Sequence, residues 1–340
     1  MVPALLILLL FSARADSQTR LLPVIVGGRT GYIDASGAMI IPPQFLEAHP
    51  FSDGFAVVRK AEDSLIPESR LGYVNTEGQF HEVRGAEMLG DFQDGFARAR
   101  FFDRSVSTEA GNCFIDTSGR VAIRPGFDNV GDFSEGLAWV EERHYFLFLK
   151  ISDTYGYIDR TGALVIKNRF GGAGNFSQGR ANVVLNGKKG YINRRGETVI
   201  PARFDGVGAF SAGLAAVCVG DRWGFIDTLG SVVIPPAFDD ARQFSGGLAA
   251  VESSGRWGFV TKSGTMAIGP AYSDVSGFRE GLSTAKQEGK WGFIDTTGAF
   301  RIEPKFDYAM AFTNGVAFVE IAGARGYINV KGDFIWPPTR

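Results

Sequence analysis

The chain has 340 residues, of which 45% are hydrophobic and 21% charged, and its 35 basic side chains nearly balance its 37 acidic ones. These values are typical of a soluble globular protein, and the interspersed charges form no basic patch of the kind that nucleic-acid binding requires. The 45 glycines and 29 phenylalanines are unusually many. Glycine permits tight turns and aromatic residues favour strands, so the composition predicts an all-β protein.

The first residues have a different pattern from the rest. An apolar stretch from Ala4 to Phe11 is followed by the small-residue pattern Ala13-Arg14-Ala15. This resembles a secretory signal peptide, although no basic residue precedes the apolar stretch, and the stretch is too short for a membrane-spanning helix. We therefore expect residues 1–15 to be a signal peptide, the mature chain to lack a transmembrane segment, and the protein to be exported to the periplasm, the cell surface or the exterior.

From about Leu21 onward the chain is a tandem repeat. A glycine marks each copy, at Gly31, Gly72, Gly156, Gly190, Gly224, Gly258, Gly292 and Gly326, with Cys113 in the equivalent place of the third copy. The last six glycines are 34 residues apart, and a fixed period of this size indicates a solenoid, a propeller or another array. A phenylalanine lies 20 residues after each of the first eight markers, from Phe51 to Phe312. The sequence thus predicts nine copies in residues 16–340, with a regular period from about residue 156.

Each copy is predicted to fold as three antiparallel strands. In the sixth copy these are Leu214 to Val217, Trp223 to Asp227 and Ser231 to Ile234. Asp227 and Gly230 bound a tight turn, because aspartate bonds the backbone two residues on and glycine accepts a left-handed conformation. Both faces of the strands are apolar, so the units must stack on one another. The glycine at 224 is expected to mark a place where a neighbouring side chain approaches the backbone.

The ends of the chain bear on whether the array closes. It opens on a strand of the first type, from Leu22 to Val26, and ends on a strand of the third type at Phe334-Ile335. No unit is split between the two ends, so none is available to join a ring. We therefore expect an open, gently superhelical stack, with a closed β-propeller as the alternative.

These motifs resemble the WG-repeat family of bacterial proteins. The Trp-Gly pairs are Trp223-Gly224, Trp257-Gly258 and Trp291-Gly292, and weaker copies stand at Gly156, Gly190 and Gly326. The segments Ile-Pro-x-x-Phe-Asp and Phe-Ser-x-Gly-Leu-Ala recur in register over the mature chain. The resemblance implies an interaction scaffold without catalytic activity. The first copies depart from it, since Thr30, Leu71 and Asn112 replace the tryptophan.

Three long hairpins interrupt the early copies and are the predicted partner-binding surface. They run from Lys60 to Arg70, from Phe101 to Ser107 and from Glu141 to Lys150. Insertions at equivalent loops emerge on one face of an array, although they can also be neutral length variation. The candidate partner-binding residues are aromatic anchors among charges: Phe101, Phe102, Arg104, Arg143, Tyr145, Phe146 and Phe148. We expect the apolar run from Tyr145 to Phe148 to pack on its own array, with a foreign ligand as the alternative.

Catalytic, metal and cofactor sites are not predicted. The histidines His49, His81 and His144 stand in different copies without ligand spacing. The turn aspartates, such as Asp227, alternate with asparagine at Asn193, and a general acid does not tolerate that replacement whereas a turn cap does. The serine of Phe-Ser-x-Gly is likewise interpreted as a turn residue.

Two functions remain. The first is a non-catalytic scaffold that binds other proteins in the bacterial envelope or outside the cell. The second is a carbohydrate- or cell-wall-binding module, in which periodic aromatic side chains stack on sugar rings. Exposure of Trp223, Trp257 and Trp291 distinguishes the two, and we expect these side chains to be buried.

Overall fold

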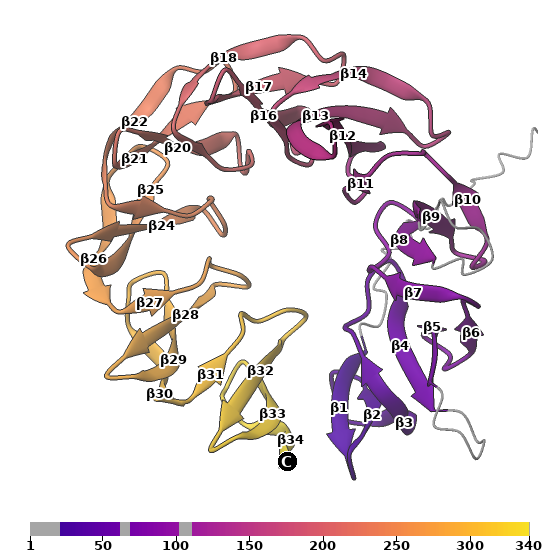
Figure 1. Cartoon of the computed structure of the whole chain (residues 1–340). Coiled ribbons are helices and arrows are strands. Elements are labelled where there is room, and N and C mark those ends of the chain that lie inside the picture. Colours follow the sequence, from indigo (N-terminus) through magenta and orange to yellow (C-terminus); the bar gives the residue numbers. More distant parts are fainter. Residues whose placement is uncertain (1–20, 62–68, 102–110, 340) are drawn as a thin grey trace, which may run out of the picture.

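The computed structural model describes residues 21–61, 69–101 and 111–339 (Figure 1). In these ranges the regular elements are all β-strands, arranged as nine three-stranded repeat units round a ring (Figure 1). The predicted signal peptide, residues 1–15, lies outside them. No described helix is long and apolar enough to cross a membrane.

The strands of the nine units fall into three series and a set of short strands. The first strands are β1 (Leu22–Val26), β4 (Phe55–Ala61), β8 (Phe96–Phe101), β12 (Leu137–Phe146), β16 (Arg180–Leu185), β20 (Leu214–Val219), β24 (Leu248–Ser253), β28 (Leu282–Gln287) and β32 (Val316–Ile321). The second strands are β2 (Arg29–Ile33), β5 (Ser69–Asn75), β9 (Asn112–Asp116), β13 (Leu149–Asp159), β17 (Lys188–Asn193), β21 (Arg222–Asp227), β25 (Arg256–Thr261), β29 (Lys290–Asp295) and β33 (Ala324–Asn329). The third strands are β3 (Met39–Ala48), β6 (Phe80–Glu82), β10 (Val121–Ile123), β14 (Leu164–Phe170), β18 (Thr198–Phe204), β22 (Val232–Phe238), β26 (Met266–Tyr272), β30 (Phe300–Phe306) and β34 (Phe334–Thr339). The short strands are β7 (Ala86–Leu89), β11 (Asn129–Val130), β15 (Gly172–Ala173), β19 (Gly206–Val207), β23 (Asp240–Ala241), β27 (Asp274–Val275) and β31 (Tyr308–Ala309).

Hydrogen bonding groups these described strands into eight antiparallel sheets, the blades of a β-propeller. Seven sheets have four strands, in which a short strand pairs with the first strand of its unit. The other sheet has six strands and contains the first two units, because β3 is long enough to pair with both β2 and β4.

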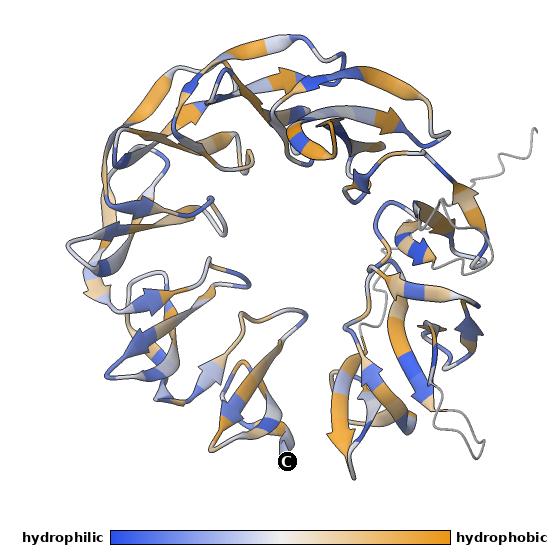
Figure 2. Ribbon diagram, viewed as in Figure 1, coloured by the Kyte–Doolittle hydropathy of each residue, from blue (hydrophilic) through white to orange (hydrophobic). Residues whose placement is uncertain are grey.

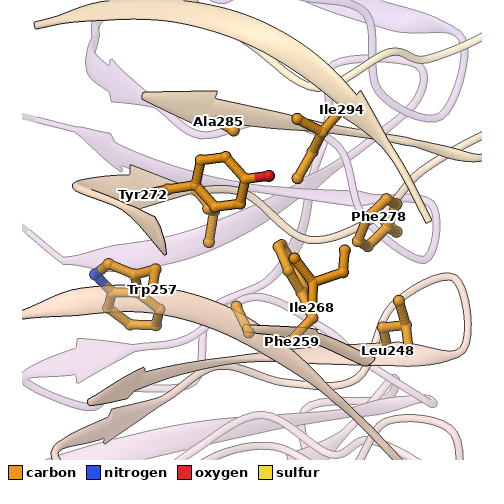
Figure 3. Close-up of a cluster of buried hydrophobic side chains, with 10 residues drawn as sticks. Leu248, Trp257, Phe259, Ile268, Tyr272, Phe278, Ala285 and Ile294 are labelled. Atoms are coloured by element: carbon orange, nitrogen blue, oxygen red, sulfur yellow. The ribbon is translucent and has the colours of Figure 1, made fainter. Parts of the chain in front are cut away.

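The core lies between successive units. In one interface Phe225 and Ile234 of the sixth unit enclose Phe244, which leads into the seventh unit and also contacts Val251 there. Figure 3 shows the next interface, where Phe278 packs in the same way on Phe259 and Ile268. Apolar segments accordingly recur in every unit round the ring (Figure 2). This confirms the prediction of stacked units buried on both faces.

An aromatic pair occupies each of the eight interfaces between consecutive units. The ring centroids are 4.6 to 5.2 Å apart, within the usual range for edge-to-face and offset pairs. The pairs are Tyr32–Phe51, Tyr73–Phe92, Phe114–Phe133, Tyr157–Phe176, Tyr191–Phe210, Phe225–Phe244, Phe259–Phe278 and Phe293–Phe312. The phenylalanine that recurs in the sequence is therefore the filler between units.

The expectation of an open superhelical stack is wrong, because the ring is closed. The hydroxyl of Tyr327 donates to the Pro23 carbonyl over 2.8 Å, and the Thr339 hydroxyl donates to the Ile25 carbonyl over 3.0 Å. Val24 and Val316 also share one apolar cluster with Tyr327. Closure thus needs no split unit, since side-chain hydroxyls and apolar packing join the last unit to the first.

Two local interpretations also need correction. A Cβ atom on Gly224 would lie 2.4 Å from the carbonyl oxygen of Ile234 in the adjacent strand, so the close neighbour is backbone and not a side chain. The cause is a register shift between β21 and β22. The Ser211 hydroxyl does more than shape its turn, because it donates to the Phe244 carbonyl of the next unit over 2.7 Å.

The turn aspartates behave as predicted. The Asp227 carboxylate accepts the backbone N–H groups of Leu229 and Ser231, each at 2.9 Å. Asn193 accepts the N–H groups of Arg195 and Glu197 in the same way, each at 3.0 Å. An oxygen acceptor is therefore what this position requires, whichever residue supplies it.

Candidate functional site

The hairpin formed by β12 and β13 extends beyond the body of the fourth unit. Its ladder runs over ten residue pairs, from Leu137–Asp159 to Phe146–Leu149, whereas that of β16 and β17 has six. Four additional pairs lengthen a hairpin by about 13 Å at the usual rise of a strand. The end of this hairpin therefore projects past the turns of the regular units.

The projecting end is apolar and exposed. Six consecutive or nearly consecutive large side chains lie there, with exposures from 57% for Tyr145 to 98% for Phe148. They are Tyr145, Phe146, Leu147, Phe148, Leu149 and Ile151, and we call them the hairpin tip. Large apolar side chains grouped in this way on a surface mark interaction sites. The expectation that Tyr145 to Phe148 pack on their own array is thus wrong.

The turn of the hairpin tip has an unfavourable sequence for its geometry. Leu147 and Phe148 both adopt positive φ, at 47° and 71°. Two-residue hairpin turns of this kind favour Asn-Gly, which stands at the equivalent turn Asn186-Gly187 of the fifth unit. Bulky residues in this conformation cost about 1 to 3 kcal/mol each. The chain therefore holds two large apolar side chains at a turn where a stable fold alone would not place them.

The base of the hairpin is held by buried and polar contacts. Glu141 is almost fully buried and accepts a hydrogen bond from Arg143 Nε over 3.1 Å. The backbone N–H of Arg143 donates to Asp128 over 2.7 Å, and His144 bonds Thr154 across the two strands over 2.8 Å. These contacts fix the base of the hairpin below the hairpin tip.

Two cations flank the hairpin tip, and both have partners. The hydrogen bond and charge of Glu141 raise the pKa of the Arg143 guanidinium, and the hydrogen bond to Asp153 raises the pKa of the Lys150 amine. Lys150 Nζ lies 2.8 Å from the Asp153 carboxylate. Each of these two cations is therefore paired with a carboxylate.

The predicted partner-binding residues fall into three groups according to where they lie in the structure. It brings Tyr145, Phe146 and Phe148 together at the hairpin tip, with Arg143 below them as a bracing residue. It does not place Phe101 there, because that side chain is half-buried against the core of the second and third units. Phe102 and Arg104 lie outside the described residues, as do residues 62–68 of the first long hairpin.

The predicted binding hairpin, Glu141 to Lys150, contained Leu149 but did not name it as a candidate, and it ended before Ile151. Both are strongly exposed and continue the apolar surface along β13. The signal was present, since two large aliphatic residues beside Lys150 have no counterpart in the regular units.

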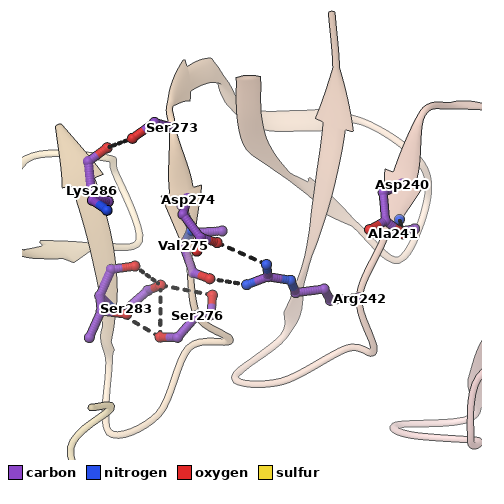
Figure 4. A network of polar contacts seen from close by, with 10 residues as sticks. Asp240, Ala241, Arg242, Ser273, Asp274, Val275, Ser276, Ser283 and Lys286 are labelled. Atoms are coloured by element: carbon purple, nitrogen blue, oxygen red, sulfur yellow. Dashed lines mark hydrogen bonds and ion pairs between the residues drawn. The ribbon is translucent and has the colours of Figure 1, made fainter. Parts of the chain in front are cut away.

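The tryptophans of the repeat belong to the packing of the ring. Trp257 is buried, with the guanidinium carbon of Arg242 4.2 Å from its ring centroid. Arg242 also binds Asp274 of the next unit over 2.8 Å (Figure 4). Trp223 and Trp291 are half-buried and pack against the cores of their interfaces. None of these three side chains forms an open stacking platform.

No group of three or more potential metal ligands occurs among the described residues. His49 bonds Asp91 over 2.9 Å, and the His81 ring stacks on that of Tyr73. Cys113 and Cys218 are both buried and free.

Comparisons with known proteins follow the repeat. The family model described as WG containing repeat matches seven segments that together cover more than half of the chain: residues 31–62, 114–143, 155–188, 190–223, 223–257, 257–291 and 291–323. A comparison with curated proteins gives no significant match.

Several solved structures are distantly similar. Apo AztD from Citrobacter koseri is 13% identical, with 83% of this chain and 93% of that chain covered and a TM-score of 0.43. Dihydro-heme d1 dehydrogenase NirN in complex with DHE is 11% identical, with 95% and 72% covered and a TM-score of 0.43. The protein lmo1340 from Listeria monocytogenes EGD-e is 9% identical, with 86% and 93% covered and a TM-score of 0.36. These distant likenesses say nothing about what this chain binds.

Proposed function

This chain belongs to the family of WG-containing repeat proteins, and we propose that it is a non-catalytic scaffold that binds another protein through the hairpin tip. One observation carries the proposal: six large apolar side chains are exposed at the end of one braced hairpin. Aromatic residues that lose much surface on binding supply most of the affinity of protein interfaces. The paired charges of Arg143 and Lys150 provide a polar rim around them.

A protein partner agrees with the chemistry of this surface better than a membrane does. A membrane-binding segment usually carries unpaired basic residues that attract anionic lipid. Here both cations near the hairpin tip lie beside carboxylates. The carbohydrate alternative has no supporting observation, because Trp257 is buried and Trp223 and Trp291 are half-buried.

We further propose that the protein works outside the cytoplasm, because residues 1–15 resemble a signal peptide. The measurement is the intact mass of the protein recovered from the envelope fraction. A mass that corresponds to a chain beginning at Asp16 supports export, and an uncleaved chain in the cytoplasm contradicts it.

Site-specific photo-crosslinking tests the binding surface. A photoreactive residue at position 148 should yield one defined protein adduct in cells, and that adduct should disappear when Tyr145 and Phe146 are both replaced by serine. The purified partner should then bind the double variant at least tenfold more weakly. A matched control is Leu229→Ser, which removes an equally exposed apolar side chain from a regular turn.

A second variant separates the hairpin from the ring. Replacing residues 143–153 by Asn-Gly gives the hairpin the length found between β16 and β17. We expect a folded ring that no longer binds the partner. Unchanged binding would place the interface elsewhere on the ring, and sedimentation of the wild-type chain with anionic vesicles, lost in the short variant, would identify a membrane contact instead.

A further inference from the structure

The interface between the last and the first unit is built like the other eight but, as far as the described residues go, lacks one part. In a regular interface Phe244 lies among Ala216 and Phe225 of one unit and Val251 of the next. Strand pairing identifies the counterparts of Phe225 and Val251 as Tyr327 and Val24, and these two share a cluster with Val316. Within the described part of the chain, this cluster contains no counterpart of Phe244.

The sequence has no phenylalanine at the regular spacing before this interface. Phe244 precedes Val251 by seven residues, and Phe210 precedes Val217 by the same number. Seven residues before Val24 stands Ser17, which lies outside the described residues.

A pocket lies at this joint. Its volume is about 320 Å³, and its walls include Val24, Val316, Phe318, Tyr327 and Trp336. This size is at the lower end of the roughly 300 to 1,000 Å³ typical of ligand pockets. Phe318 and Trp336 stand where Ala216 and Ile234 stand in the sixth interface, so the pocket has three aromatic walls.

A hydroxyl group in the pocket wall stands where a regular interface binds the main-chain carbonyl of its phenylalanine. Thr313 lines the pocket and occupies the position of Ser211, whose hydroxyl donates to the carbonyl of Phe244 over 2.7 Å. The same serine-to-phenylalanine hydrogen bond links four other pairs of units at 2.7 to 2.8 Å. The Thr313 hydroxyl has no hydrogen bond within the described residues. The pocket therefore has aromatic walls and a hydroxyl donor for a carbonyl group. The regular interfaces use the same combination to hold a phenylalanine.

We propose that this pocket binds a phenylalanine residue in an extended segment of another polypeptide. The phenyl ring would lie against Phe318, Tyr327 and Trp336, which line the pocket, and the main-chain carbonyl of the same residue would accept a hydrogen bond from the Thr313 hydroxyl. The segment need not add to the sheet beside β1, because the carbonyls of Pro23 and Ile25 already accept hydrogen bonds from Tyr327 and Thr339. This site is separate from the hairpin tip and does not depend on the function proposed for it.

The chain supplies its own probe. An acetylated and amidated peptide with the sequence of residues 206–213, Gly-Val-Gly-Ala-Phe-Ser-Ala-Gly, carries the segment that fills a regular interface. Titration calorimetry with the full chain should show one binding site. The same peptide with alanine in place of its phenylalanine should bind at least tenfold more weakly. Equal affinities, or no binding of the first peptide, would overturn the proposal.

Two variants of the protein complete the test. Ala311→Trp places a large side chain in the wall of the pocket and should abolish binding, whereas Ala209→Trp makes the same change at the equivalent, exposed position of a regular unit and should not. Thr313→Val keeps the shape of the wall, and the loss of one hydrogen bond should weaken binding roughly two- to tenfold. Wild-type affinity in folded Ala311→Trp, judged by an unchanged thermal midpoint, would place the peptide elsewhere.

Discussion

The hydroxyl of Ser211 donates a hydrogen bond to the main-chain oxygen of Phe244 over 2.7 Å, and so ties one unit of the propeller to the phenylalanine that fills the next interface. A single residue thus contributes both the apolar filler and the polar acceptor of the joint. The units are coupled by side chains, because the strands of neighbouring units belong mostly to different sheets.

Removal of this hydroxyl should weaken the joint measurably. Ser211→Ala leaves a carbonyl without its donor, and we expect the free energy of unfolding to fall by roughly 0.5 to 1.5 kcal/mol. Thr313→Ala is the matched control, because that hydroxyl has no partner among the described residues. Urea unfolding of both variants provides the comparison. Equal losses would show that the serine acts within its own turn.

Removal of the aromatic filler should cost more. Phe244 is almost fully buried, and Phe244→Ala should lower the free energy of unfolding by about 3 to 5 kcal/mol because it leaves a cavity between two units. Ile226→Ala, in the preceding interface between the fifth and sixth units, should cost about 2 to 5 kcal/mol. The exposed Leu229 serves as control, since Leu229→Ala should change stability by less than about 0.5 kcal/mol.

The glycine of the Trp-Gly pair should not tolerate a side chain. Gly224→Ala would place Cβ 2.4 Å from the Ile234 carbonyl oxygen, and the strands would have to separate. We expect a loss of about 1 to 3 kcal/mol, as is usual for overpacked sites. Gly269→Ala is the control, because no atom lies within 4 Å of its Cβ position. Thermal unfolding of the two variants would distinguish a steric requirement from a general preference for glycine.

One turn aspartate should make stability depend on pH. The hydrogen bond from Thr297 lowers the pKa of Asp295 to about 2, with help from backbone N–H groups. A lowered folded-state pKa contributes stability that is fully present above the unfolded pKa, near 3.9, and is lost as pH falls toward about 2. The difference in unfolding free energy between the wild type and Asp295→Asn should therefore stay constant from neutral pH to about pH 5 and shrink below it. A difference that does not change between pH 5 and pH 2 would contradict this assignment.

The turn of the hairpin tip should become more stable when its strain is relieved. Leu147→Asn combined with Phe148→Gly supplies residues that accept positive φ, and the hydrogen-exchange protection of the Phe146 and Leu149 amides should rise. The same variant should bind the partner more weakly, because two exposed apolar side chains are gone. Lower protection would show that these side chains stabilise the hairpin itself.

The sequence predicted the repeat unit well because local chemistry determines it. The spacing of Gly156 to Gly326 identified the units, and the exchange of Asp227 for Asn193 identified a turn cap. Closure could not be predicted, since it depends on a small rotation between neighbouring units that no single motif encodes. Exposure of the hairpin tip was expected only as the alternative, because a run such as Tyr145 to Phe148 is equally apolar whether it packs on its own protein or binds a partner.

The seam between the last and the first unit is encoded in part by the spacing of the repeat. Counting back seven residues from Val24 reaches Ser17, so the regular spacing provides no phenylalanine for this interface. That the interface is joined instead by the hydroxyls of Tyr327 and Thr339 depends on geometry between residues some 300 positions apart.

The hydrogen bond from Tyr327 to Pro23 helps to close the ring of units. Eight interfaces are linked by continuous chain and filled by a phenylalanine, while the contacts of the ninth within the described residues include two hydroxyl hydrogen bonds and one apolar cluster. We expect heating or denaturant to separate the last unit from the first before any single unit unfolds. The closed ring would then become an open array of folded units. The least stable interface of the ring would then be the one between the first and the last unit.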